Sequence, residues 1–194
     1  IGHYFIPRYT RVVDTAESKE NINKAYNLIS TSKVRNEMII DDVITCVARK
    51  QTPVILTRFK EHAKFLHDAL KEKADHVFLL YGDNSDKENA EIRVKLKQIP
   101  ENESLILVAT GQKIGEGFDF PRLDVLMLAA PVSFEGRLEQ YVGRLNRDYV
   151  GKEAVYVYDY IDSHVRYFDK MYAKRLRTYR KMGFSIWTQE LQPK

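Results

Sequence analysis

The sequence predicts an α/β domain in which helices cover both faces of a mainly parallel sheet. Short apolar runs alternate with amphipathic helical segments along most of the chain. These runs are continuously apolar, which is typical of strands that are buried on both faces. The 194 residues are enough for one substantial core.

The composition excludes several classes of protein. The formal net charge is +4, from 31 Lys and Arg against 27 Asp and Glu. No apolar run has the length of a bilayer span and no signal-peptide pattern opens the chain, so we expect a cytoplasmic protein with no membrane partner. The one cysteine, Cys46, is interpreted as a buried structural thiol. The five histidines form no H-x₃-H or H-E-x-x-H pair, so no metal site is predicted.

Residues 1–50 are predicted to form an arm and a helical pair that lead into the domain. Residues 4–13 should be extended, with Pro7 interrupting any hydrogen-bonded ladder. Apolar residues at helical spacing predict helices over about 17–29 and 34–48.

Residues 51–162 are predicted to form the core. Strands are expected over 53–57, 77–80, 105–109, 125–128 and 154–158. Helices are expected after the first strand, from Ser85 through Leu96, and over about 135–147. Ser85 and Glu88 have the spacing of a capping box. In such sheets ligands bind beyond the carboxyl ends of the strands.

Residues 163–194 are predicted to form a basic helix and tail of the same domain. Seven Lys and Arg residues stand against one acid, Asp169, between His164 and Gly183. Apolar residues at helical spacing would pack one face on the domain. The other face, with Lys174, Arg175 and Arg177, is predicted to contact a nucleic-acid backbone. A solvated structural helix is the alternative.

A glycine-rich loop over 110–121 follows the third predicted strand. Glycines such as Gly111 and Gly117 let a ligand approach the backbone closely. Thr110 and the adjacent amides are placed to bind phosphate oxygens, and Asp119 to accept from a ribose hydroxyl. The loop matches neither a Walker A nor a dinucleotide motif. The alternative is a surface loop whose aromatic residues fold onto the core.

The next predicted helix carries two arginines on one edge. Its buried stripe consists of Leu138, Val142 and Leu145. Gln140, Arg144 and Arg147 follow the same spacing two residues later, on another face. Gly143 in mid-helix costs about 1 kcal/mol relative to Ala, which makes sense if another group must come close. Guanidinium groups suit the γ-phosphate of a nucleotide, whereas ordinary surface arginines are the alternative.

Four segments occur in the order of known helicase motifs. Residues 53–59 resemble motif IV, 80–82 resemble motif IVa, 110–121 resemble motif V, and 140–147 are similar to the Q-x-x-G-R-x-x-R form of motif VI. On these residues the sequence resembles the C-terminal RecA-like domain of superfamily-two helicases and translocases. The resemblance covers roughly residues 52–160.

The resemblance implies that the chain is the second motor domain of an ATP-dependent helicase or translocase. Arg144 and Arg147 would act as arginine fingers, with Gln140 positioning them. Nucleotide contacts are implied for Gly117, Asp119 and Gly143. Nucleic-acid contacts are implied for Thr57, Arg58, Thr110 and Gly111, although Thr57 is equally interpreted as a strand-end hydroxyl bonded to its own backbone.

The partners follow from what the sequence contains and lacks. The Q-x-x-G-R-x-x-R form is similar to DNA-directed relatives such as restriction and repair motors, which favours DNA over RNA. No G-x-x-x-x-G-K-[ST] and no Asp-Glu dipeptide occurs, so ATP and Mg²⁺ would be held mainly by an N-terminal RecA-like domain of the same polypeptide. We expect the chain to be a piece of a longer protein and, on its own, to bind ATP weakly and not to hydrolyse it.

Two rival functions remain. The first is a non-catalytic module that keeps the RecA-like fold for nucleic-acid or protein contact, and a Walker A motif in the parent sequence would argue against it. The second is a doubly wound nucleotide-dependent transferase. That enzyme would need a glycine-rich loop after its first strand, where residues 58–61 contain no glycine.

Overall fold

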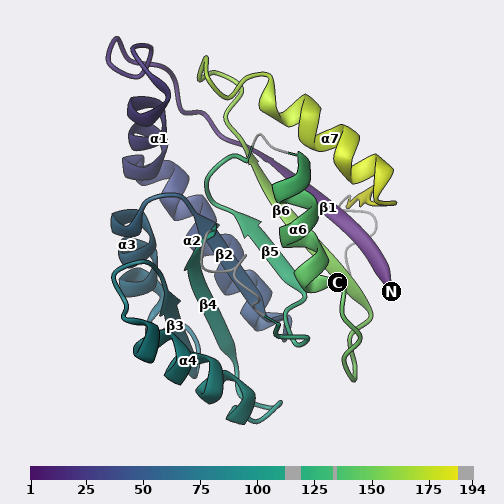
Figure 1. The fold of residues 1–194 in the computed structure, drawn as a ribbon. Helices are drawn as coiled ribbons and strands as arrows, with labels where there is room; N and C mark the ends of the chain where they lie inside the picture. Colours follow the sequence, from purple (N-terminus) through teal and green to yellow (C-terminus); the bar gives the residue numbers. More distant parts are fainter. Residues whose placement is uncertain (112–118, 133–134, 188–194) are drawn as a thin grey trace.

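Seven strands form one sheet in the computed structural model, which describes residues 1–111, 119–132 and 135–187 (Figure 1). Their order is β3-β4-β2-β5-β6-β1-β7, and each described pairing is parallel. The predicted α/β fold is therefore confirmed. The strands are β1 Gly2–Tyr9, β2 Pro53–Thr57, β3 His76–Leu80, β4 Leu105–Thr110, β5 Val125–Leu128, β6 Ala154–Ile161 and β7 Ser185–Ile186.

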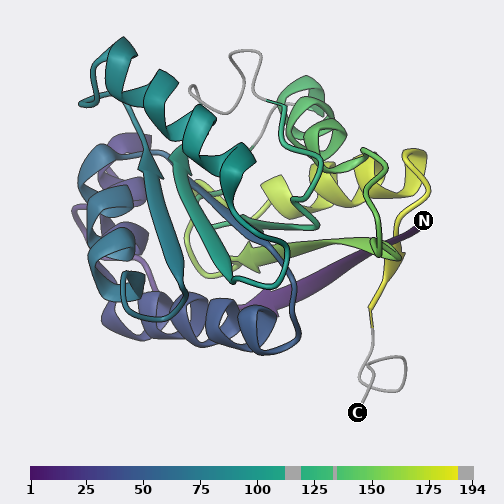
Figure 2. The same cartoon turned by 90° about the horizontal axis from the view of Figure 1, so that it is seen from below.

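Helices cover both faces of the sheet. Helices α2 and α3 lie on one face with α1 beside them, and α4, α6 and α7 lie on the other (Figure 2). The helices are α1 Ile22–Thr31, α2 Lys33–Ala48, α3 Lys60–Leu70, α4 Asp86–Gln98, α6 Glu135–Leu145 and α7 Met171–Lys181.

The central strands are buried on both sides. Val54 and Leu56 of β2 pack in the cluster beneath α4, α6 and α7, whereas Ile55 between them packs against α2 and α3. This alternation explains why β5 is apolar throughout and β2 is apolar up to Thr57, and both strands have the predicted bounds. Cys46 lies in the second cluster, and burial raises the pKa of its thiol to about 12. Its interpretation as a buried thiol is confirmed.

The N-terminal arm differs from the prediction. Residues 2–9 form β1, which pairs with β6 along its whole length, so Pro7 does not interrupt the ladder. The carbonyl of Phe5 accepts from Trp187 on the β7 side. Because strand residues alternate in direction, the nitrogen of Pro7 also points to that side. It lies beyond the two residues of β7, where no ladder bond is required.

Two helices begin later than predicted. Helix α1 starts at Ile22, five residues after the expected start. The side chain of Asn21 accepts a hydrogen bond from the amide of Lys24 and thereby caps the helix at that point. Residues ahead of it form a turn in which the Thr15 and Ser18 side chains bond each other's amides. The basic helix α7 starts at Met171, after turns over 163–170. The Ser85–Glu88 capping box of α4 is present as predicted.

Candidate functional site

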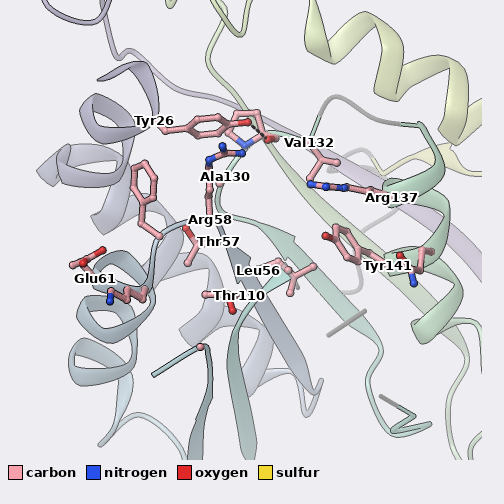
Figure 3. A pocket seen from close by; sticks show the side chains of 16 residues that line it. Tyr26, Leu56, Thr57, Arg58, Glu61, Thr110, Ala130, Val132, Arg137 and Tyr141 are labelled. Atoms are coloured by element: carbon pink, nitrogen blue, oxygen red, sulfur yellow. Dashed lines mark hydrogen bonds between the residues drawn. The ribbon is translucent and has the colours of Figure 1, made fainter. Parts of the chain in front are cut away.

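A cavity of about 850 Å³ opens at the carboxyl ends of β2, β4 and β5 (Figure 3). Strand β2 lies between β4 and β5, so the chain changes sides of β2 as it passes from β4 to β5. A crevice at such a switch point is the usual ligand site of a parallel sheet. We call this cavity the groove. Its lining consists of Tyr26, Leu56, Thr57, Arg58, Phe59, Lys60, Glu61, Gly82, Thr110, Gly111, Ala130, Pro131, Val132, Arg137, Gln140 and Tyr141.

The lining of the groove is positively charged. Arg58 and Lys60 follow β2, and Arg137 stands in the first turn of α6 on the other side. All three residues line the open cavity, and Glu61 is the one acid among the described residues of the lining. Cations on both sides of an open cavity suit an anionic chain such as a phosphate backbone.

The hydroxyl of Thr57 is already engaged inside the domain. Thr57 is 4% exposed, and its Oγ1 lies 2.5 Å from Nδ1 of His62. Nε2 of His62 donates to Oδ1 of Asn36, whose Nδ2 donates to the carbonyl of Ser30. Nδ1 of His62 is therefore the acceptor and Thr57 the donor. Burial lowers the pKa of His62 to about 3, which keeps the ring neutral.

This hydrogen-bond chain corrects the role expected for Thr57. Because its one proton goes to His62, the hydroxyl cannot also donate to a phosphate. The side chain supports the wall of the groove, and the bond goes to a neighbouring side chain instead of its own backbone. Arg58, in contrast, is exposed at the groove, with its Cζ atom 4.5 Å from the ring centroid of Tyr26.

Motifs V and VI meet at the far wall of the groove. Thr110 and Gly111 line the groove at the end of β4, and Gln140 and Tyr141 line it from α6. The register pairs Thr110 with Thr57 of β2, which brings segments 53 residues apart to one edge. The structure thus collects five predicted residues around one cavity, namely Thr57, Arg58, Thr110, Gly111 and Gln140.

The two predicted arginine fingers lie further along the chain and outside the lining of the groove. Arg144 is partly buried on α6, and Arg147 follows the end of that helix. Nη2 of Arg147 lies 3.4 Å from Oδ2 of Asp119, and both side chains are about half exposed. The pair joins two residues that were assigned separately to a nucleotide site. Gly117, assigned to the same site, lies outside the described residues.

Gly143 stands on the exposed side of α6. Among the described residues, no atom outside the adjoining backbone of α6 lies within 4 Å of the position that a Cβ at residue 143 would take. Nothing in the described part of the domain therefore requires a glycine there. The stripe of Leu138, Val142 and Leu145 on the same helix is buried as predicted.

The basic helix requires a second correction. Arg175 is 3% exposed, and its Nε and Nη2 atoms donate to the two carboxylate oxygens of Asp159 at 2.7 and 2.8 Å. Burial by itself lowers the pKa of this guanidinium, but the Asp159 carboxylate raises it overall. Arg175 therefore anchors α7 to β6 and does not face a nucleic acid. Lys174 and Arg177 are not buried in this way.

Three further cationic or aromatic residues of the groove escaped the sequence reasoning, namely Tyr26, Lys60 and Arg137. Arg35 was missed as well: it is fully buried, and its Nε and Nη2 atoms donate to the carboxylate of Asp162. Asp159 and Asp162, in and just after the apolar run of β6, could have predicted such buried arginines, because a buried carboxylate needs a partner. Arg137 lies one turn before Gln140, at a spacing that places both on one helix face.

The described residues contain neither a membrane span nor a metal cluster. No helix in this part of the chain is long and apolar enough to cross a bilayer. Within the same residues, no three His, Cys, Asp or Glu side chains gather as metal ligands.

The fold and the groove define the class first: a RecA-like α/β domain with a cationic crevice at its switch point. The family of the helicase conserved C-terminal domain matches residues 34–148, and this chain belongs to it. Transcript termination protein A18 of Yaba-like disease virus is 30% identical over 163 residues, covering 78% of this chain and 33% of that protein. Protein A18 of Fowlpox virus is 27% identical over 135 residues, covering 68% and 28%.

A solved structure supports the same fold. The crystal structure of T4 UvsW has a TM-score of 0.74 and 21% identity, covering 94% of this chain and 40% of that one. The chain spans about a third of the length of the curated relatives it matches. The predicted resemblance to the C-terminal domain of superfamily-two helicases is confirmed.

Proposed function

We propose that this helicase-type domain is the second motor domain of an ATP-dependent nucleic-acid translocase, with DNA as the favoured substrate. The observation that carries the proposal is the groove. Residues of motifs IV, V and VI, far apart in sequence, line one cationic cavity at the carboxyl edge of the sheet. In this role Arg58, Lys60 and Arg137 hold backbone phosphates, and the amides near Thr110 and Gly111 add hydrogen bonds.

The nucleotide is proposed to bind beside the groove, between this domain and an N-terminal RecA-like domain. Members of this family use ATP and Mg²⁺ as full-length proteins, and the sequence here lacks the Walker A loop that would hold them. The Arg147–Asp119 pair is half exposed, and such pairs contribute about 0–1 kcal/mol. A bound nucleotide can therefore replace it, taking Arg147 at the γ-phosphate and Asp119 at the ribose, with Arg144 as the second finger.

The test is an ATPase assay of the full-length protein with single-stranded and duplex DNA and RNA as stimulants. Arg147→Ala should lower the stimulated kcat by about 10³–10⁵ while leaving the half-stimulating nucleic-acid concentration unchanged. Arg58→Ala should raise that concentration and reduce the salt slope of binding by about 1. The two variants thus separate the nucleotide site from the groove.

Arg49→Ala is the matched control. Arg49 is exposed after α2, just before β2 begins, and so lies at the opposite edge of the sheet. It should leave both parameters unchanged. A full-length protein whose ATPase is the same with Arg147→Ala as without it would exclude the arginine-finger role.

A further inference from the structure

Three side chains from three helices hold the segment that leads into α6. This segment, residues 129–132, connects β5 to the helix that begins at Glu135. Arg35 of α2 donates to the carbonyl of Ala129 at 2.5 Å, Tyr26 of α1 to that of Pro131 at 2.8 Å, and Arg175 of α7 to that of Val132 at 3.4 Å. The position of α6 relative to the sheet is therefore set in part by these donors.

Tyr26 is the member of this set that also lines the groove. One face of its ring receives the guanidinium of Arg58 at 4.5 Å, as Figure 3 shows, and its hydroxyl reaches Pro131. The ring is held by Phe168, with centroids 4.8 Å apart, and by Phe59 at 6.2 Å. One rigid side chain thus contacts both a groove cation and the segment that carries α6.

The chemistry of Tyr26 suits a fixed link. The side chain is 4% exposed, and burial raises the pKa of its phenol, so the hydroxyl stays protonated and keeps donating. Pro131 is also buried. A hydrogen bond between buried groups is not readily exchanged for water. Movement of the ring is therefore passed to the Pro131 backbone.

We propose that Tyr26 is a positioning residue that couples occupation of the groove to the placement of α6. A phosphate that pairs with Arg58 fixes the guanidinium and, through the cation–π contact, the ring beneath it. The hydroxyl of Tyr26 then holds the 129–132 segment and with it α6, which carries Gln140 and Arg144. This inference rests on the proposed function. Tyr26 belongs to α1, which precedes the residues 34–148 that the family matches.

The experiment separates the two contacts of Tyr26 in the full-length protein. Tyr26→Phe removes the hydroxyl but keeps the ring under Arg58, and Tyr26→Leu removes both. The ATPase rate is measured without nucleic acid and across a titration of DNA. Tyr167→Phe is the matched control, since the hydroxyl of Tyr167 also donates to a backbone carbonyl, that of Lys19, outside the groove.

Tyr26→Phe should lower the maximal DNA-stimulated rate about two- to tenfold, the value of one hydrogen bond. The stimulated rate should fall by a larger factor than the basal rate, and the half-stimulating DNA concentration should change by less than about twofold. Tyr26→Leu should also raise that concentration about two- to fivefold, because it removes the cation–π interaction with Arg58. Melting temperatures of both variants and the control check that each protein is folded at the assay temperature.

Each other outcome overturns the inference. Equal reduction of basal and stimulated rates with Tyr26→Phe would assign the residue a purely structural role. Stimulated rates of Tyr26→Phe that match those of Tyr167→Phe would show that the Tyr26 hydroxyl does not couple the groove to α6. If Arg58→Ala still weakens DNA binding in these cases, the proposed function stands without the coupling. If Arg58→Ala has no effect either, the groove itself is wrongly assigned.

Discussion

The phenolic oxygen of Tyr141 occupies the space beside Gly111. A Cβ on residue 111 would lie 2.5 Å from that oxygen and 3.2 Å from the ring carbon Cζ. Tyr141 is 8% exposed and packs in the core beneath α6. The end of β4 and the helix of motif VI therefore approach each other so closely that residue 111 has room for hydrogen alone. This approach forms one wall of the groove.

Gly111→Ala should accordingly destabilise the chain by about 1–3 kcal/mol, the usual effect of overpacking. Tyr141→Phe removes the clashing oxygen, so the double variant should recover part of that stability. Urea unfolding of the two single variants and the double variant measures this coupling. Strictly additive effects would show that the two residues do not touch.

Gly143 offers the opposite case, because no described atom would meet a Cβ there. Gly143→Ala should stabilise the chain by about 0.5–1 kcal/mol through helix propensity alone. In the full-length protein the same change should lower ATPase activity if nucleotide or the first domain packs against α6. Unfolding of the chain and turnover of the full-length protein are the two measurements. An unaltered turnover would leave the glycine without a functional reason.

Neighbouring cations on α7 should respond differently to substitution. Arg175→Ala leaves the buried carboxylate of Asp159 without its cation and should cost about 3–5 kcal/mol of unfolding free energy. Lys174→Ala with Arg177→Ala should change stability by less than about 0.5 kcal/mol. If this face binds phosphates, the double variant should reduce the salt slope by about 0.9 for each phosphate that these two side chains neutralise. Equal slopes with and without these cations would make α7 a structural helix.

Asp124, at the opposite edge of the sheet, should make the stability of the fold depend on pH. Burial raises the pKa of its carboxyl from 3.8 to about 6, although the carboxylate accepts the Thr52 amide at 2.7 Å. Between these values the folded state binds the proton more tightly than the unfolded state. The stabilisation by the protonated group is therefore complete below pH 3.8 and disappears as the pH rises through 6.

Asp124→Asn keeps an acceptor for Thr52 and removes the ionisation. The variant should be more stable than the parent by about 1–3 kcal/mol at a pH of about 7.5. The difference should fade as the pH falls toward about 4. Thermal or urea unfolding over this range provides the check, and a difference that does not vary with pH would mean that Asp124 titrates normally.

Local patterns in the sequence were sufficient to predict the central elements. Strands β2 and β5 are buried on both faces, so their apolar runs, Pro53–Leu56 and Val125–Leu128, coincide with these strands except for the final Thr57 of β2. The stripe of α6 and the capping box of α4 depend on residues three or four positions apart. The edge of the sheet at which the groove lies was also predictable, because ligands of parallel sheets bind beyond the carboxyl ends of the strands.

Contacts between distant segments were beyond that reasoning. A helical arginine is ordinarily exposed, and the carboxylates of Asp159 and Asp162 are the charged partners that stabilise Arg175 and Arg35, respectively, in the interior. Thr57 was misassigned because its partner, His62, lies on the following helix and not in its own strand. Tyr26 gave no signal at all, since its two contacts come from segments 32 and 105 residues later.

The position of β1 bears on how the chain acquires its structure during synthesis. Gly2 pairs with Ala154 and Tyr9 with Ile161, so the first strand meets its partner only after residues 10–153 have left the ribosome. Until then, apolar residues such as Phe5 and Ile6 lack the strand that pairs with them in the folded domain and are open to wrong pairing. Pairings this remote in sequence form slowly, and the arrival of β6 is the event that allows β1 to join the sheet.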